Sequence, residues 1–323
     1  MSIPRISVIM SVFNGASYLD RAMESLLNQS YADFEILAVD DASEDNSLEI
    51  LRSYQDPRMH VFVNDYNIGL SASLNRGIAA ARGRYIARMD ADDICQSERF
   101  ARQIQYLESN RQVVSLGTWA DMYSEEEEFL YTEKLPVDSG ELKAMLPVSP
   151  FIHGSVMMRL DALQAAGGYK PAFRNRQDVI LWMDMKNLGD FANLPEPLYG
   201  FRITSQSNQR KSKAYIAAQN RVILCYYHEK RIDREALDSL EPHGGGLTWR
   251  QRRSEYYLLL GKIFIEKEFD RGRSMKYLLK AVAANGCNGT AWFNLFLLLL
   301  PTPFIRLWKK RRLRAGLYGR SFN

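Results

Sequence analysis

The first 93 residues alternate between short apolar segments and helical patterns, and this alternation constrains the fold more than any other feature. The apolar segments are rich in β-branched and aromatic residues, as buried strands are, whereas the helical patterns repeat apolar residues every three or four positions. We expect strands over residues 5–13, 34–39, 60–63 and 85–89, separated by helices over 16–28, 44–54 and 71–81. Strands that alternate with helices form parallel sheets through right-handed crossovers. The sequence therefore predicts an α/β fold with a mainly parallel sheet flanked by helices.

Three carboxylates follow the fourth predicted strand, in the segment Asp90-Ala-Asp92-Asp93. Asp90 and Asp92 are two residues apart, so they project to the same side of an extended chain. Grouped carboxylates repel one another and are costly to dehydrate, and a bound cation removes that cost. Oxygen ligands suit Mg²⁺ or Mn²⁺, which leaves much of its coordination shell to substrate phosphates. The alternative is that Asp92 or Asp93 caps the helix that begins near Ser97.

Polar side chains also end the first two predicted strands. Ser11 and Asn14 lie at the end of the first, and Asp40 and Asp41 at the end of the second. Parallel sheets bind ligands beyond the carboxyl ends of their strands, so we expect these residues and Asp90 to surround a nucleoside diphosphate bridged to the protein by the cation. The chain has neither a GxGxxG fingerprint after the first strand nor a GxxxxGK[ST] phosphate loop. The alternative for Asp40 and Asp41 is capping of the following helix.

Composition and charge exclude several classes of protein. A net charge of +4 over 323 residues is mild and does not indicate nucleic-acid binding. The three cysteines are far apart and lack CxxC spacing, which is typical of a reducing cytoplasm rather than of a disulfide framework or zinc site. The N-terminus lacks the features of a signal peptide, and no apolar run reaches the roughly 18–20 residues of a membrane span. We therefore expect a cytoplasmic protein.

Five short motifs occur in order along residues 6–202, and together they resemble family 2 glycosyltransferases, which have the GT-A, Rossmann-like fold. The motifs are Ser7-Val-Ile-Met-Ser-Val-Phe-Asn14, Val39-Asp-Asp-Ala-Ser43, Asn67-Ile-Gly69 with Asn75-Arg-Gly77, Gly83-Arg-Tyr-Ile86 and Asp90-Ala-Asp-Asp93. The resemblance implies transfer of a sugar, with inversion, from a nucleotide diphosphate sugar to a hydroxyl group. By family habit the base is uracil.

The resemblance also implies roles for single residues. Asp41 would contact the nucleobase and Asp90 the ribose, while Asp92, together with Asp90, would bind Mn²⁺ or Mg²⁺ on the diphosphate. Ser11 and Asn14 would line the nucleotide pocket. A carboxylate accepts a hydrogen bond from a ring N–H of uracil, so Asp41 suits its role chemically.

Asn67 and His153 are further candidates for binding the nucleotide sugar. The alternative for Asn67 is a turn residue before Gly69. His153 lies before a strand in Phe151-Ile-His-Gly-Ser155, a segment similar to the acceptor-side strand of the family. It could hydrogen-bond the substrate or a metal-bound phosphate, and the alternative is a histidine satisfied within the protein.

Asp178 stands at the start of a helical pattern, in Gln177-Asp-Val-Ile-Leu181-Trp182. This matches the family's Glu/Gln-Asp-x-x-Leu-Trp pattern, in which the Asp is the general base that takes the proton of the acceptor hydroxyl. The metal would stabilise the leaving diphosphate, so no separate acid is needed. The alternative is that Asp178 caps the helix.

We expect a catalytic domain over residues 1–210 and a helical extension over 211–323. The acidic run Glu125–Glu128 is expected to be a solvated loop. Residues 291–300 are apolar and precede basic residues at 309–314, a pattern typical of contact with anionic lipid at the inner face of the cell membrane. The alternative is a core helix followed by a solvated basic tail.

The resemblance therefore predicts a glycosyltransferase of surface-polysaccharide biosynthesis that uses a saccharide or lipid-linked acceptor. It transfers single sugars, because the QxxRW signature of processive enzymes is absent. One alternative is a nucleotidyltransferase, which needs a Gly-rich loop with Arg or Lys after the first strand. Another is a protein that binds sugar nucleotides without glycosyl transfer.

Overall fold

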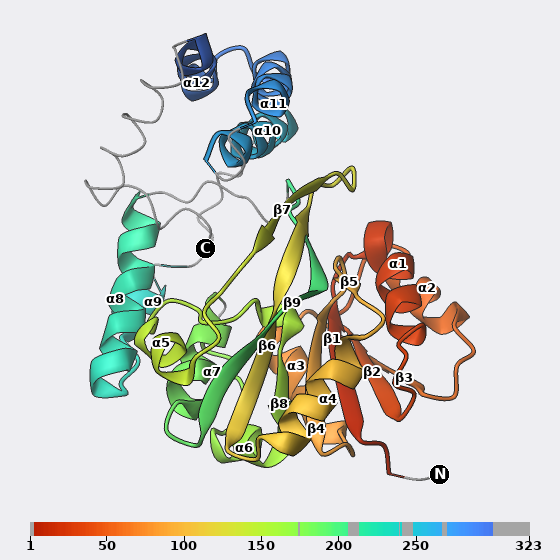
Figure 1. Cartoon of the computed structure of the whole chain (residues 1–323). Coiled ribbons are helices and arrows are strands. Elements are labelled where there is room, and N and C mark those ends of the chain that lie inside the picture. The colour runs from red at the N-terminus through yellow and green to blue at the C-terminus, as the bar shows by residue number, and fades with distance from the viewer. Residues whose placement is uncertain are drawn as a thin grey trace. The chain divides into compact units, whose positions relative to one another are not determined.

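The computed structural model describes residues 3–173, 175–205, 213–238, 240, 248–266 and 270–299. The contacts within the chain define two compact units, whose elements Figure 1 labels. The first comprises residues 1–122, 132–202 and 213–241, and the second comprises 123–131, 203–212 and 242–323. This division differs from the expected boundary at residue 210, because the segment 213–241 groups with the first unit and a segment near residue 125 groups with the second.

Four parallel strands form one half of the sheet in the first unit, in the order β3-β2-β1-β4. They are β1 (Ile6–Val12), β2 (Phe34–Asp40), β3 (Met59–Val63) and β4 (Tyr85–Asp90). β1, β2 and β4 are almost wholly buried, as their continuous apolar sequences predict. The register pairs Ser11 of β1 with Val39 on one side and Asp90 on the other. The polar ends of these three strands therefore lie at one edge of the sheet.

The other half of the sheet is mixed and continues the order as β4-β8-β6-β9-β5, with β7 beside β6. β8 is antiparallel to both β4 and β6, and β5 is antiparallel to β9. β9 runs parallel to β6, since the backbone N–H of Asp190 donates to the Gln112 carbonyl and that of Ile203 donates to the Tyr123 carbonyl. Its strands are β5 (Ile94–Cys95), β6 (Val113–Tyr123), β7 (Phe129–Glu133), β8 (Met157–Arg159) and β9 (Asp190–Arg202). The predicted α/β fold is confirmed, but the sheet is mixed rather than mainly parallel, because its second half contains strands of both directions. This second half carries the chain from the carboxylates after β4 to the segments around His153 and Asp178.

Helices flank this sheet, with α4 in front of it and α3 behind it in Figure 1. α3 packs closely on β1, since a Cβ atom on its Gly77 would lie 2.7 Å from Cγ2 of Ile9. The helical elements of the first unit are α1 (Ala16–Leu27), α2 (Ser47–Ser53), α3 (Leu70–Ala80), α4 (Arg99–Ser109), α5 (Ser139–Ala144), η1 (His153–Ser155), α6 (Leu160–Ala165), α7 (Gln177–Met185), α8 (Lys213–Glu229) and α9 (Arg234–Asp238).

The second unit contains α10 (Trp249–Glu266), α11 (Arg271–Ala284) and α12 (Gly289–Leu299). α10 and α11 pack as a helical hairpin, and a Cβ atom on Gly261 would lie 2.7 Å from Cγ of Leu278. Ser254 and Ser274 donate hydrogen bonds across the hairpin, to the carbonyls of Ala281 and Gly261. Among the described residues, no helix has the length and apolar character needed to cross a membrane.

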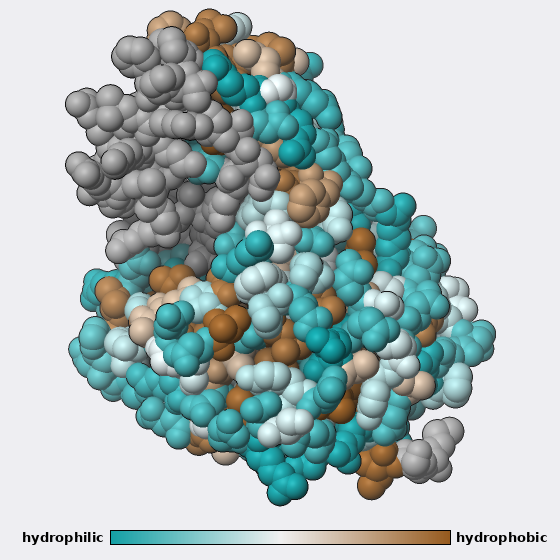
Figure 2. Space-filling view, viewed as in Figure 1, coloured by the Kyte–Doolittle hydropathy of each residue, from teal (hydrophilic) through white to brown (hydrophobic). Residues whose placement is uncertain are grey.

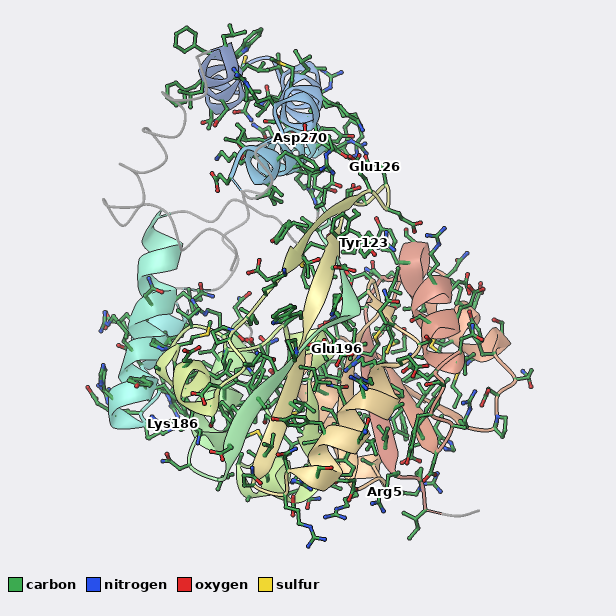
Figure 3. The ribbon with its side chains drawn as sticks, viewed as in Figure 1. Arg5, Tyr123, Glu126, Lys186, Glu196 and Asp270 are labelled. Carbon is green, nitrogen blue, oxygen red and sulfur yellow. The ribbon has the colours of Figure 1, made fainter. Side chains whose placement is uncertain are left out.

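The turn between β6 and β7, on which Figure 3 labels Glu126, belongs to this second unit. The hydroxyl of Tyr277 donates to Glu128 at 2.6 Å, and Lys276 Nζ lies 3.0 Å from the same carboxylate. The hydroxyl of Tyr256 accepts from the backbone N–H of Glu125 at 2.7 Å. The expectation of a solvated loop is therefore wrong for Glu125 and Glu128, because partners far along the sequence bind them.

Candidate active site

The carboxyl ends of β1 and β2 are joined by hydrogen bonds of Asn14. This residue adopts a left-handed backbone conformation with φ of 52°. Its backbone N–H donates to the Ser43 hydroxyl at 3.1 Å, and its side-chain oxygen accepts from the backbone N–H of Glu44 at 2.8 Å. Ser11 and Asn14 are thus brought to the edge of the sheet where the sequence predicts the nucleotide.

Asp41 is buried and holds the loop that follows β3. Its carboxylate accepts from the Asn64 amide at 2.7 Å and from the backbone N–H groups of Ile68 and Gly69, both at 2.9 Å. Asn67 is exposed on the same loop. Neither Asp40 nor Asp41 caps α2, whose N-cap residue is Asn46. The capping alternative is therefore wrong for both aspartates, and Asp41 orders the loop that carries Asn67.

The three carboxylates after β4 have different surroundings. Asp93 is buried, and its oxygens accept from the Tyr199 hydroxyl and the Arg202 backbone N–H, both at 2.7 Å. Asp90 accepts from the buried guanidinium of Arg88 at 2.5 Å. Burial, and next the charge of Asp90, raise the pKa of Asp92 to about 6. Asp93 is therefore part of the framework, whereas Asp90 and Asp92 are neighbouring carboxylates, of which Asp90 is paired with Arg88.

The arrangement of Asp90 and Asp92 fits a divalent cation. Burial first, and the charge of Asp90 second, raise the pKa of Asp92, and a cation beside the two carboxylates would oppose both effects. Within the described ranges, no three His, Cys, Asp or Glu side chains are grouped so that they alone could hold a metal. Two carboxylates are what Mg²⁺ commonly takes from a protein when phosphates complete its shell. α4 begins at Arg99 with Glu98 as its N-cap residue, so neither Asp92 nor Asp93 caps that helix.

His153 lies on η1, beside the end of β4. Its Nε2 is 2.6 Å from the Tyr169 hydroxyl, and a Cβ atom on Gly154 would lie 2.8 Å from Oδ2 of Asp90. Burial, and next the charge of Arg88, lower the pKa of His153 to about 4, although Asp178 and Asp90 oppose this shift. His153 is therefore neutral near pH 7, and both carboxylates lie within electrostatic range of it.

Asp178 is the second residue of α7. The N-cap residue is Arg176, which has φ of 57° and makes no side-chain capping bond. The capping alternative is therefore wrong for Asp178. Its Oδ2 lies 2.9 Å from the Ser149 hydroxyl, which is also 2.9 Å from the Phe151 carbonyl. The carboxylate is partly exposed, and a nearby hydroxyl fixes one of its oxygens.

Sequence reasoning missed several residues that build this site. Tyr169 follows two glycines and Ser149 precedes a proline, and neither belongs to a sequence pattern that indicates a functional residue. Arg88 gave a usable signal, because a charged residue inside a buried strand requires a partner, here Asp90. Arg76, within the Asn75-Arg-Gly77 motif, donates to the Val63 carbonyl and to the side chain of Asn64.

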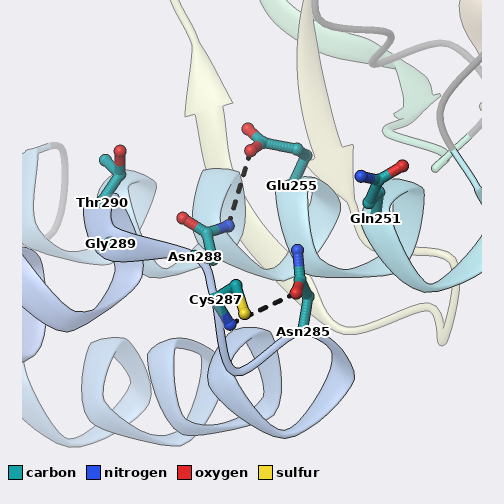
Figure 4. Close-up of a pocket in the computed structure, with 7 residues that line it drawn as sticks. All are labelled: Gln251, Glu255, Asn285, Cys287, Asn288, Gly289 and Thr290. Carbon is teal, nitrogen blue, oxygen red and sulfur yellow. Dashed lines mark hydrogen bonds between the residues drawn. The ribbon is translucent and has the colours of Figure 1, made fainter.

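A polar cavity of about 190 Å³ lies in the second unit (Figure 4). None of the residues predicted from the sequence to be functional lines it. Its walls are formed by Gln251, Glu255, Asn285, Cys287, Asn288, Gly289 and Thr290.

Comparison with known proteins identifies the family. The model of glycosyl transferase family 2 matches residues 7–167. The relative EpsE of Bacillus subtilis, which is named as a glycosyltransferase, is 34% identical over 236 residues, which cover 71% of this chain and 83% of EpsE. The O-antigen biosynthesis glycosyltransferase WbnJ of Escherichia coli is 32% identical over 218 residues, 65% of this chain and 84% of WbnJ.

The fold is shared with a solved structure, TarS 1-349 of S. aureus in complex with UDP-GlcNAc. The TM-score is 0.51 at 16% sequence identity, with 88% of this chain and 74% of that one covered. The family match and the two relatives agree with the motifs at the strand ends. The chain belongs to glycosyl transferase family 2 and is a glycosyltransferase.

Proposed function

We propose that this enzyme transfers a sugar from a UDP-sugar to a hydroxyl group of a saccharide or lipid-linked acceptor, with inversion at the anomeric carbon. The observation that carries this proposal is that Asp90, which adjoins Gly154, and Asp178 are both near enough to His153 to influence its charge. The charges of Asp90 and Asp178 both act to raise the pKa of His153, although 88 residues separate them along the sequence. A donor diphosphate and an acceptor hydroxyl need such groups on either side of one reacting carbon.

Asp178 is the general base in this proposal. It takes the proton from the acceptor hydroxyl as the oxygen attacks C1 of the sugar from the face opposite the diphosphate. The C1–O bond to the diphosphate breaks, and the electron pair leaves with the phosphate oxygen. The Ser149 hydroxyl holds Oδ2 of Asp178, which leaves the other oxygen to face the acceptor.

Asp92 and Asp90 would hold Mn²⁺ or Mg²⁺, which supplies charge neutralisation for the departing diphosphate when it is bound. Arg88, buried beneath Asp90, fixes the orientation of that carboxylate. In the resemblance Asp90 also contacts the ribose. We thus propose that Asp90 contacts both the divalent ion and the ribose.

Ser11, Asn14, Asp41 and Asn67 form the nucleotide side. Three protein donors already bind Asp41, so its contact with the base would use the remaining capacity of its oxygens. The uridine nucleotide is supported by TarS, whose structure contains UDP-GlcNAc. The likeness to TarS establishes the fold of this chain and no other feature.

The pathway proposed is biosynthesis of a surface polysaccharide in the cytoplasm, at the inner face of the cell membrane. WbnJ, named for O-antigen biosynthesis, supports this assignment. α12 supports membrane contact, because it exposes Trp292, Phe293, Phe296 and Leu299, and hydrophobic side chains gather over it at the top of Figure 2. The basic residues 309–314 lie outside the described residues.

The experiment that tests the function is a panel of UDP-, GDP- and TDP-sugars, each incubated with the full chain and Mn²⁺. Release of the nucleoside diphosphate and transfer to saccharide or polyprenyl-linked acceptors are measured. Turnover with a UDP-sugar is the expected result. Binding of a sugar nucleotide without release of UDP in the presence of any acceptor would favour a binding protein instead, and formation of the sugar nucleotide from a sugar phosphate would favour a nucleotidyltransferase.

A further inference from the structure

We propose that Tyr169 is a positioning residue that holds His153 in the tautomer with its proton on Nδ1, so that His153 donates a hydrogen bond to an oxygen of the nucleoside diphosphate. The inference rests on the proposed function, because it assigns a donor within the proposed nucleotide site. The starting observation is the 2.6 Å distance between His153 Nε2 and the Tyr169 hydroxyl.

The tautomer follows from counting hydrogens. Tyr169 is 2% exposed, and its hydroxyl carries a single hydrogen. Among the described residues, His153 Nε2 is the partner of that hydroxyl. If Nε2 carried a proton, it would donate to the tyrosine oxygen, and the buried phenolic hydrogen would have no acceptor within the part of the chain that the structure describes. Buried donors are rarely left unsatisfied, so the Tyr169 hydroxyl donates to Nε2 and the ring proton is on Nδ1.

Tyr169 is held in place by Asn75 of α3. The Asn75 amide donates to the Tyr169 carbonyl at 2.8 Å and accepts from the Tyr169 backbone N–H at 2.9 Å. Gly168 has φ of 66°, and a Cβ atom on it would lie 2.8 Å from Oδ1 of Asn75. The turn thus brings the backbone of Tyr169 against α3 and fixes where its hydroxyl lies.

The diphosphate is the ligand whose chemistry fits the free N–H of His153. Nδ1 has no hydrogen-bond partner in the described part of the chain, and the His153 side chain is partly exposed. The backbone beside His153 adjoins Oδ2 of Asp90, one of the two carboxylates proposed to hold the cation on the diphosphate. A phosphate oxygen there accepts from a neutral N–H donor, and it meets no second positive charge that would compete with the cation.

The tautomer is tested by NMR on the full chain labelled with ¹⁵N-histidine, which contains four histidines. The His153 signals are assigned by their loss in His153→Gln. We expect a protonated Nδ1 and an unprotonated Nε2 in the wild type, and a shift towards the Nε2–H form in Tyr169→Phe. The matched control is Tyr226→Phe, which removes a buried hydroxyl that donates to Asp184. An Nε2–H tautomer in the wild type, or no change in Tyr169→Phe, overturns the inference.

The phosphate contact is tested by calorimetry with Mn²⁺, using UDP and uridine as probes. We expect Tyr169→Phe to raise the Kd of UDP by about threefold to tenfold, the range of one hydrogen bond, and to leave uridine unaffected. Tyr226→Phe should change neither. Equal weakening of UDP and uridine overturns the phosphate contact. A wild type that binds no nucleoside diphosphate overturns the proposed function, whereas an Nε2–H tautomer in a protein that binds UDP overturns this inference alone.

Discussion

The side-chain amide of Asn75 forms two hydrogen bonds with the backbone of Tyr169, one to its carbonyl and one from its N–H. The two residues are 94 positions apart, and the bonds join α3 to the turn that precedes α7. Displacement of this turn would move the Tyr169 hydroxyl away from His153. Asn75 therefore couples the position of α3 to that of the Tyr169 hydroxyl beside His153.

Replacing the proposed base should separate binding from turnover. Asp178→Asn keeps the shape of the side chain but cannot take a proton, so we expect turnover to fall by about 100-fold or more. The affinity for UDP, measured by calorimetry, should remain unchanged. The control is Asp184→Asn on the same helix, whose carboxylate binds Tyr226 and Lys230. Full activity of Asp178→Asn would show that the base lies elsewhere.

Removing Asp92 should abolish metal-dependent binding of the nucleotide. Calorimetry of UDP binding with and without Mn²⁺ should show a clear gain from the ion in the wild type and none in Asp92→Ala. The physical reason is that the remaining carboxylate, Asp90, is already paired with Arg88. Asp33→Ala, at an exposed aspartate before β2, serves as the control. Retention of the Mn²⁺ effect in Asp92→Ala would exclude Asp92 as a ligand.

Glu35 should give a stability that depends on pH. Burial acts to raise its pKa, but hydrogen bonds from Ser7 and Arg82 outweigh burial, so the folded pKa lies below the ordinary value of 4.5. Between the folded pKa and the ordinary value, the unfolded chain binds more protons than the folded chain. The stabilisation present at neutral pH is therefore lost as the pH falls through the folded pKa.

We therefore expect Glu35→Gln to lower the free energy of unfolding by about 1–2 kcal/mol at pH 7, allowing for the half-exposed Arg82 side chain. Urea denaturation at pH 7 and at pH 4 should show that the difference from the wild type narrows at the lower pH. A difference that stays constant, or grows, would contradict the assignment.

The contact between Tyr277 and Glu128 should stabilise the helical hairpin of the second unit. A double-mutant cycle with Tyr277→Phe and Glu128→Gln should give a coupling energy of about 1 kcal/mol, because the hydroxyl donates to a carboxylate at 2.6 Å. Hydrogen exchange in α10 and α11 is the measurement, since it reports on this unit. Phenylalanine preserves the stacking of ring 277 on Phe264, so purely additive effects would show that the hydrogen bond contributes nothing.

The exposed face of α12 should bind anionic lipid. We expect Trp292→Ser combined with Phe296→Ser, and truncation before Ala291, to reduce flotation with vesicles that contain phosphatidylglycerol. Vesicles of phosphatidylcholine alone should bind the wild type weakly. Leu188→Ser, which removes another exposed apolar side chain, is the control. Equal flotation of wild type and variants, or none with either lipid, would count against membrane contact.

Local patterns predicted the parallel half of the fold and the positions of the strand-end residues. The alternation of apolar and helical segments placed β1, β2 and β4, because buried parallel strands have continuous apolar sequences. Asp90 and Ser11 could be predicted to be neighbours, since the carboxyl ends of adjacent parallel strands meet. These inferences need only the spacing of apolar residues along the sequence and the handedness of the connections between strands.

Partners from distant segments could not be predicted in this way. An acidic residue at a helix start and an acidic run in a loop have common local explanations, capping for Asp178 and solvation for Glu128. Their actual contacts, Ser149 and Tyr277, depend on tertiary packing that no local pattern encodes. The bond between Tyr169 and His153 likewise joins a turn to a separate helical segment.

The segment 123–131 limits how this protein can be divided into fragments. It lies between β6 and β7 in the sequence, yet the carboxylates of Glu126 and Glu128 accept hydrogen bonds from tyrosines more than a hundred positions later. A fragment ending at residue 241 would keep these acids and lose the tyrosines, and a fragment beginning at 242 would keep the tyrosines and lose the acids. No single division of the chain keeps these hydrogen bonds, so the α10–α11 hairpin should be studied together with the β6–β7 hairpin.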